Sequence, residues 1–425
     1  MFLAIHHALR KLRDVPHARK LRDVPHARKL RGVPHGAGSS FPGLVFIPVV
    51  FALVLWSGCR KQPASVVVSN PTESNAPSAS QEIAKVSTRR NQNKYPQLLS
   101  DYKLYRGELA KLEPAEGVIE YELNTTLFSD YSGKQRLVRL PEGKLAKYEA
   151  VAALDFPVGT VISKTFYYDH DLTDSTRGRR LIETRILQRT DSGWIGIPFV
   201  WNDEQTDATL TLAGAAIDVQ WNHTDGVARS NTHIVPNLND CKRCHQNESM
   251  EPLGPTARNL NRDVAYEHGT ENQLAFWARK GLLSDLPKLE NAPKLAVWDD
   301  PKSGSLDERA RAWLEINCSH CHNPKGPARN SGLHLNVDVT DRYQLGVFKT
   351  PVAAGKGTGG RSYGIVPGKP DESILLYRLE TTHPGALMPE FGRTVVHDES
   401  VALIREWIEH MPEGAVAQAA SDASL

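Results

Sequence analysis

Two short motifs bring thiols and imidazoles together at a spacing that suits one chemistry. The first motif contains Cys241, Cys244 and His245, and the second contains Cys318, Cys321 and His322. In each motif the two thiols lie one helical turn apart and a histidine follows directly, which is the spacing of covalent haem c attachment. Two thioether bonds hold the porphyrin edge, and the imidazole ligates the iron. The sequence therefore predicts two haems c.

Two other uses of the same thiols compete with haem. Two Cys-x-x-Cys pairs also match a four-thiolate zinc site, and the pairs could form disulfides. Neither use needs a histidine after each pair, and composition alone would place His at both positions only about once in a thousand cases. Five cysteines in 425 residues are also few for a disulfide scaffold. Haem is the favoured interpretation.

The second motif has a candidate for the sixth iron ligand. Met388 lies in a Pro-rich loop before the expected last helix, and the chain has only four methionines. His383 in the same loop is the competing ligand, whereas His320, between the two cysteines, is interpreted as incidental. The turn at residues 323–327 could offer a backbone carbonyl to the second ring nitrogen of His322. We expect His322 and Met388 as the iron ligands, a pair that raises the haem potential relative to two imidazoles.

The first motif is less complete. His245 is its expected proximal ligand, with residues 254–255 (Gly-Pro) in the role of the turn. Downstream, Met250 and His268 are the candidates for the sixth position. Met250 lies only five residues from His245, which leaves little chain to reach the opposite haem face. Met250, His268 and a vacant sixth position therefore all stay open.

The residues before position 237 alternate between apolar and polar types. The clearest segments are 158–168, 181–187, 194–201 and 208–213, separated by Gly, Asp and Asn. A period of two is typical of half-buried strands. We predict an antiparallel β domain over 96–236, shaped as a sandwich or barrel.

The period changes to that of helices after position 237. Residues 270–273 resemble a capping box before an apolar stripe, residues 305–308 resemble another before the second motif, and a last helix is expected from Asp398. Trp313 and Trp407 are expected to pack the two outer helices of the second unit together. The predicted class is α+β, with the β domain followed by two mainly α cytochrome c-like haem units at 237–300 and 301–413 and a disordered tail at 414–425.

The N-terminal region reads as an export signal. A proline-containing nine-residue repeat occupies 11–35, and a charge-free apolar run at 44–56 ends in Ser-Gly-Cys59. The run is too short to span a bilayer and is typical of a signal h-region. A cysteine directly after Ser-Gly is similar to a bacterial lipoprotein signal, in which Cys59 carries the lipid; an ordinary secretory signal is the alternative. Residues 59–95 are polar and are expected to be a flexible tether.

Charge argues against one class of partner. The net charge of +2 conceals a segment of +7 at 1–58, so the remaining chain carries −5. A basic surface for nucleic acid is therefore not supported. Charged groups in the β domain at 183–185 and 201–204 receive no role, because charges at strand ends are usually solvated or paired.

Several sequence segments resemble a bacterial family of dihaem c-type cytochromes, mostly described as conserved hypothetical proteins. Besides the two motifs, they are 121–124 (YELN), 156–160 (FPVGT), 183–185 (ETR), 201–208 (WNDEQTDA), 366–370 (VPGKP) and 388–389 (MP). The resemblance covers most of the chain after the tether and implies exported electron transfer. It also implies a parallel β-helix repeat protein as a partner, because such a protein is often encoded beside these cytochromes.

Together these features predict an exported, lipid-anchored dihaem cytochrome. It would relay single electrons between periplasmic donor and acceptor proteins, with the β domain as a docking or spacer module. The alternative is an enzyme: a dihaem peroxidase, or the cytochrome subunit of a dehydrogenase, with an open first haem.

Overall fold

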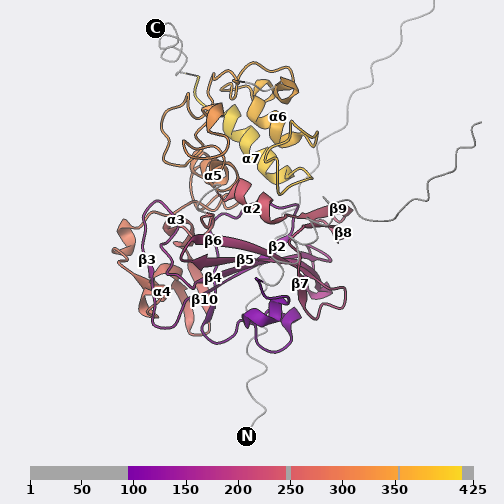
Figure 1. The fold of residues 1–425 in the computed structure, drawn as a ribbon. Helices are drawn as coiled ribbons and strands as arrows, with labels where there is room; N and C mark the ends of the chain where they lie inside the picture. The colour runs from indigo at the N-terminus through magenta and orange to yellow at the C-terminus, as the bar shows by residue number, and fades with distance from the viewer. Residues whose placement is uncertain (1–93, 246–249, 353–354, 414–425) are drawn as a thin grey trace, which may run out of the picture. The chain divides into compact units, whose positions relative to one another are not determined.

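The computed structural model describes residues 94–245, 250–352 and 355–413. The expected leader with its repeat, Cys59, nearly all of the tether and the tail lie outside these ranges. The described chain is a mixed α+β fold built on an antiparallel sheet (Figure 1). Within it, no helix combines the length and the apolar character that crossing a bilayer requires.

The main sheet has six antiparallel strands in the order β1-β2-β4-β5-β6-β7. They are β1 (Val118–Glu120), β2 (Gly133–Arg139), β4 (Val161–Asp169), β5 (Arg179–Thr190), β6 (Gly193–Trp201) and β7 (Ala208–Leu210), followed by a separate hairpin of β8 (Ala215–Asn222) and β9 (Ala228–Val235). The predicted antiparallel β region is confirmed. Its shape differs from the expected sandwich or barrel, because the main sheet is open and ends at β1 and β7.

The two faces of this sheet are covered differently. One face packs against the chain that precedes β1, with Leu99, Tyr102 and Leu112 in a core that also contains Ile186 and Phe199. The opposite face is apolar at one end, where it meets the segment after β9, and is charged in its middle. Since successive strand residues point to opposite faces, a one-residue shift would exchange these surfaces.

Residues 237–300 do not form the separate helical unit that the sequence predicted. They contain α2 (Leu238–Cys244), α3 (Ala257–Leu260), the hairpin β10 (Asp263–Tyr266) and β11 (Gly269–Asn272), α4 (Gln273–Arg279) and β12 (Leu283–Ser284). Strand β12 pairs in parallel with β3 (Ala146–Lys147), and Leu274 and Trp277 share one core with Phe156 and Ile162. This segment is therefore packed onto the β region.

The cap of α4 also differs from the prediction. Thr270 and Glu271 belong to β11, and the side chain of Asn272 accepts the backbone N–H groups of Leu274 and Ala275. Asn and Thr are both good N-caps, and the hairpin decides between them here because it holds position 270 in a strand.

Residues 301–413 contain α5 (Leu306–Leu314), α6 (Ile374–Glu380) and α7 (Asp398–Glu409), which lie together in Figure 1. The capping box of Ser305 with Glu308 and the start of α7 are as predicted. Trp313 and Trp407 share the core between α5 and α7, also as predicted. No cytochrome c-like helical unit is evident in either half of the described C-terminal region. The sheet and the helices together give a mixed α+β fold.

Candidate functional site

The second motif lies where α5 changes its winding. Residues Glu315–Ser319 form a π-helical turn that carries the buried Cys318, and Cys321 lies two residues after its end. The buried Asn317 fixes this turn, because its side chain donates to the Trp313 carbonyl at 3.0 Å and accepts the Phe128 N–H at 2.8 Å. Irregular helical turns of this kind are frequent at functional sites.

The hydrogen bonds of His322 fix which ring nitrogen is free. Nδ1 lies 3.1 Å from the Ser331 hydroxyl, whose own proton is donated to the Ala328 carbonyl at 2.7 Å. The hydroxyl therefore accepts from Nδ1–H, and Nε2 keeps its lone pair. This is the tautomer that an iron ligand needs. The acceptor is Ser331 rather than the expected turn at 323–327.

A cavity of about 690 Å³ opens beside this motif. Cys318, Cys321 and His322 line it, and so does Met388 from a distant part of the chain. Its walls include the apolar side chains of Leu335, Leu345 and Ile365. A cofactor pocket has this character: mostly apolar walls with a few polar groups that fix the orientation of the ligand.

The loop that carries Met388 is held from two sides. The Met388 N–H donates to the Arg378 carbonyl of α6 at 3.0 Å, and the buried Arg393 donates from Nε to the Met388 carbonyl at 2.8 Å. The competing ligand, His383, is exposed and is not among the residues that line the cavity. Of the two candidates, the structure places only Met388 at the cavity.

The first motif is carried by α2. Asn237 and Asp240 form a capping box at its start, and His245 ends it. His245 Nδ1 lies 2.7 Å from the Glu251 carbonyl, so Nδ1 carries the proton and Nε2 is free, as in the second motif. The acceptor is Glu251 rather than the expected residues 254–255. Both motif histidines thus share one tautomer.

The two candidates for the sixth ligand of the first motif have other contacts. Met250 is buried in the core beside Trp194. A Cβ at Gly196 would lie 3.0 Å from Met250 Cε and 3.3 Å from Cys241 Sγ, so these two side chains meet over the sheet. His268 lies on the surface, where Nε2 is 2.8 Å from a Glu271 carboxylate oxygen. These contacts therefore assign neither side chain as the sixth ligand of His245.

The two motifs adjoin. Arg243 and Cys244 of the first motif also line the cavity of the second. The Cys321 thiol lies 4.0 Å from the Arg243 carbonyl oxygen, and the Arg243 guanidinium sits 3.6 Å from the centre of the Phe391 ring. Groups held by the two motifs would consequently be neighbours.

Burial keeps these side chains in their neutral forms. It lowers the pKa of both His245 and His322 to about 4 and raises the pKa of both Cys318 and Cys321 to about 12. The four motif thiols are all free, and nowhere in residues 94–245, 250–352 and 355–413 do three His, Cys, Asp or Glu side chains converge as a metal site would require.

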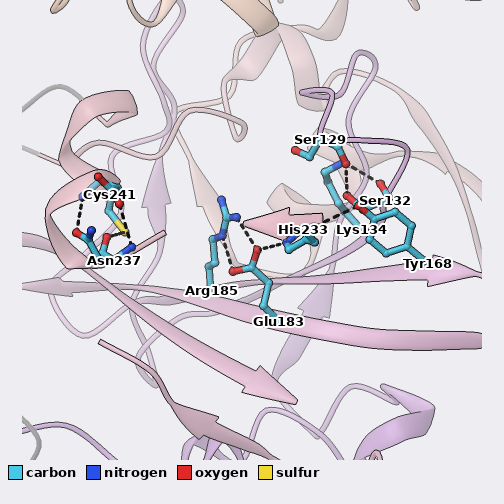
Figure 2. Close-up of polar contacts among 10 residues, drawn as sticks. Ser129, Ser132, Lys134, Tyr168, Glu183, Arg185, His233, Asn237 and Cys241 are labelled. Atoms are coloured by element: carbon cyan, nitrogen blue, oxygen red, sulfur yellow. Dashed lines mark hydrogen bonds and ion pairs between the residues drawn. The ribbon is translucent and has the colours of Figure 1, made fainter. Parts of the chain in front are cut away.

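A buried ionic network close to the first motif was missed from the sequence. Glu183 is fully buried on β5 and accepts two hydrogen bonds from Arg185, and His233 Nε2 lies 2.6 Å from its Oε1 (Figure 2). Burial alone would raise the pKa of Glu183, but Arg185 and His233 outweigh it and lower the pKa to about 2. The signal in the sequence was the charged pair at positions 183 and 185, which share one face of a strand.

Comparison with known proteins identifies no relative of this chain. No family model matches the chain, and neither the curated proteins nor the solved structures include a match.

Proposed function

We propose that the protein is an exported dihaem c-type cytochrome that transfers single electrons between periplasmic partners. One observation carries this proposal: a single cavity is lined by Cys318, Cys321, His322 and Met388. These are the two thiols, the imidazole and the thioether that a His/Met haem c requires.

The residues of the second motif have distinct tasks. Cys318 and Cys321 would hold a haem through thioether bonds, Ser331 orients His322 so that Nε2 is free to ligate, and Met388 would supply the sixth ligand. Haem c, when bound, supplies an iron that changes its charge by one electron. Leu335, Leu345 and Ile365 exclude water from it, and an apolar surrounding favours the less charged ferrous form. In this proposal residues 301–413 act as a cytochrome c-like domain, with α5 and α7 packed behind the motif.

The first motif would hold the second haem of a relay. Its Arg243 and Cys244 reach the cavity of the second motif, so an electron would pass between adjacent groups. In this proposal the β domain docks or spaces the redox partners, a donor and an acceptor in the periplasm and a parallel β-helix protein among them. The membrane would be reached through a lipid on Cys59.

One observation favours the alternative, an enzyme with an open first haem. Met250 is buried in the core and the His268 ring is paired with the Glu271 carboxylate, so neither side chain is assigned as a sixth ligand. An iron with one vacant position could bind a small molecule such as a peroxide, with the second haem supplying electrons. A dihaem peroxidase or the cytochrome subunit of a dehydrogenase would work in this way.

Counting covalent haem tests the proposal. Denatured purified protein should retain two haems per chain in the pyridine haemochrome assay. The Cys241→Ala/Cys244→Ala variant should retain one, and Cys59→Ser, which leaves both motifs intact, should retain two while leaving the membrane fraction. Two zinc-free disulfides, or one zinc per chain and no haem, would overturn it.

A further inference from the structure

Three cations stand directly opposite one another on the central strands of the main sheet. The register pairs Arg136 of β2 with Lys164 of β4, and Lys164 with Arg185 of β5. Paired residues of neighbouring strands point to the same face. Lys134 lies on that face too, one row away, because it pairs with Phe166 of β4. We call these four residues the cation face.

Such an arrangement is unfavourable unless something compensates it. Like charges directly opposite each other in a sheet destabilise it, and burial adds a desolvation cost. Arg136 is only 9% exposed, and Lys134 and Lys164 are partly buried. Burial together with Arg185 and Arg136 lowers the pKa of Lys164 to about 7.

The described chain compensates only one of the four charges with a carboxylate. The Glu183 carboxylate forms a bidentate ion pair with Arg185 and also contacts His233 Nε2 (Figure 2). Arg136 and Lys134 each donate to a backbone carbonyl, of Lys134 and Ser132 respectively. Within the described ranges Lys164 has no hydrogen bond or ion pair of its own: its Nζ lies 5.1 Å from the centre of the Phe166 ring, and the Glu183 carboxylate, which already binds Arg185 and His233, acts on it only at longer range.

The cation face adjoins the first motif. Gly196 of β6 belongs to the same face, since it pairs with Leu187, two residues from Arg185, and Cys241 packs over it. The charges also interact: Arg185 lowers the pKa of Cys241 and Cys244 against the effect of burial, and Lys164 adds to the lowering at His245. Unpaired positive charge is therefore gathered beside the first motif, to whose histidine no sixth ligand is assigned.

We propose that the cation face is a binding site for an oxyanion beside the first motif, with Lys164 at its centre and Arg136 and Lys134 as further donors. The ligand is a carboxylate or a small inorganic oxyanion that supplies the missing negative charge. It has two possible sources: a free anion that is a substrate or effector, or a propionate of the haem itself. The second source rests on the proposed function, whereas the first does not.

Sulfate is a suitable probe, because it carries the right charge and does not compete for a haem iron. Its binding is measured by calorimetry on the full-length purified protein, together with the midpoint potential of each haem. Lys164→Met removes the central charge and Lys164→Arg keeps it. Lys147→Met is the matched control, because Lys147 is exposed on the distant strand β3.

A free-anion site predicts that sulfate binds once per chain to the wild type, Lys164→Arg and Lys147→Met, and at least tenfold more weakly to Lys164→Met. A propionate site predicts no sulfate binding, but a lowered midpoint potential of one haem in Lys164→Met and in neither of the other variants. If Lys164→Met matches Lys147→Met in both measurements, the proposal is wrong. A protein without haem would refute the proposed function, while sulfate binding would still test the free-anion site.

Discussion

The two motifs have the same spacing and the same histidine tautomer but opposite surroundings. The second faces an apolar cavity that Met388 also lines, whereas the first lies against the cation face and no sixth ligand is assigned to its histidine. In the proposed function the five-residue motif would determine haem attachment, while the elements packed around it would determine charge, water access and the sixth ligand. The difference predicts a closed electron-transfer site at the second motif and a more reactive, anion-binding site at the first.

The largest effect is expected from Arg185→Met, which breaks the surroundings of the first motif. It would leave the fully buried Glu183 carboxylate without its main partner, and removing one member of a buried pair costs about 3–5 kcal/mol. Urea unfolding should show this loss in the free energy of unfolding.

The matched control for this variant is Arg180→Met on the same strand. Its ion pair with Asp203 is exposed, and such pairs contribute about 0–1 kcal/mol. Equal losses in the two variants would mean that the buried network stabilises the fold no more than an exposed ion pair does.

A pH-dependent effect is expected for Lys164→Met, because a buried amine can release its proton. Folding lowers the pKa of Lys164 from 10.5 to about 7, so the unfolded chain binds a proton that the folded chain lacks between these values. The free energy of unfolding of the wild type therefore falls as the pH decreases from about 10.5 to 7, by at most about 1.4 kcal/mol per pH unit.

The Lys164→Met variant lacks this pH-dependent contribution. Its free energy of unfolding, relative to that of the wild type, should therefore rise as the pH decreases from about 10.5 to 7 and stay constant below pH 7. Urea titrations at several pH values measure the difference, with Lys147→Met as the exposed control. A difference that does not change with pH would show that Lys164 is charged in the folded protein throughout.

How far the sequence predicts the molecule depends on the range of the forces involved. The starts of α5 and α7 and the strands around β4 to β6 follow from caps and short-range periodicity, and they were predicted. The incorporation of residues 237–300 into the β region was not, because it depends on contacts between β12 and β3, which are far apart in the chain. The capping pattern at 270–273 was overridden by a local element, the hairpin of β10 and β11, which holds Thr270 in a strand.

The site shows the same division. The motif residues could be read directly from their spacing, and Met388 from its rarity. The cation face could not, since Arg136, Lys164 and Arg185 become neighbours only through the strand register. The predicted acceptor for His322 Nδ1 was also wrong, because the Ser331 hydroxyl, nine residues along the chain, occupies that position instead of a carbonyl of the turn at 323–327.

The smallest effect is expected from Ser331→Ala, which tests the difference between the Nδ1 acceptors of His322 and His245. Ser331→Ala removes the side-chain acceptor of His322 Nδ1, whereas His245 is oriented by a backbone carbonyl that no such substitution removes. Losing this bond makes the imidazole less basic, which should raise the midpoint potential of the second haem by up to about 40 mV, the equivalent of about 1 kcal/mol. Ser331→Thr keeps the hydroxyl and should leave the potential unchanged in a spectroelectrochemical titration; a shift of both haems would contradict the assignment.

The central claim is that the second motif holds a His/Met haem and that the first has different ligation. Electron paramagnetic resonance of the ferric wild type, Met388→Ala and His383→Ala tests it most directly. The wild type should show two distinct haem signals, and Met388→Ala should convert only the low-spin signal of the second haem to high spin. His383→Ala should match the wild type. A wild type with two identical haems, or a high-spin signal produced by His383→Ala and not by Met388→Ala, would contradict the account.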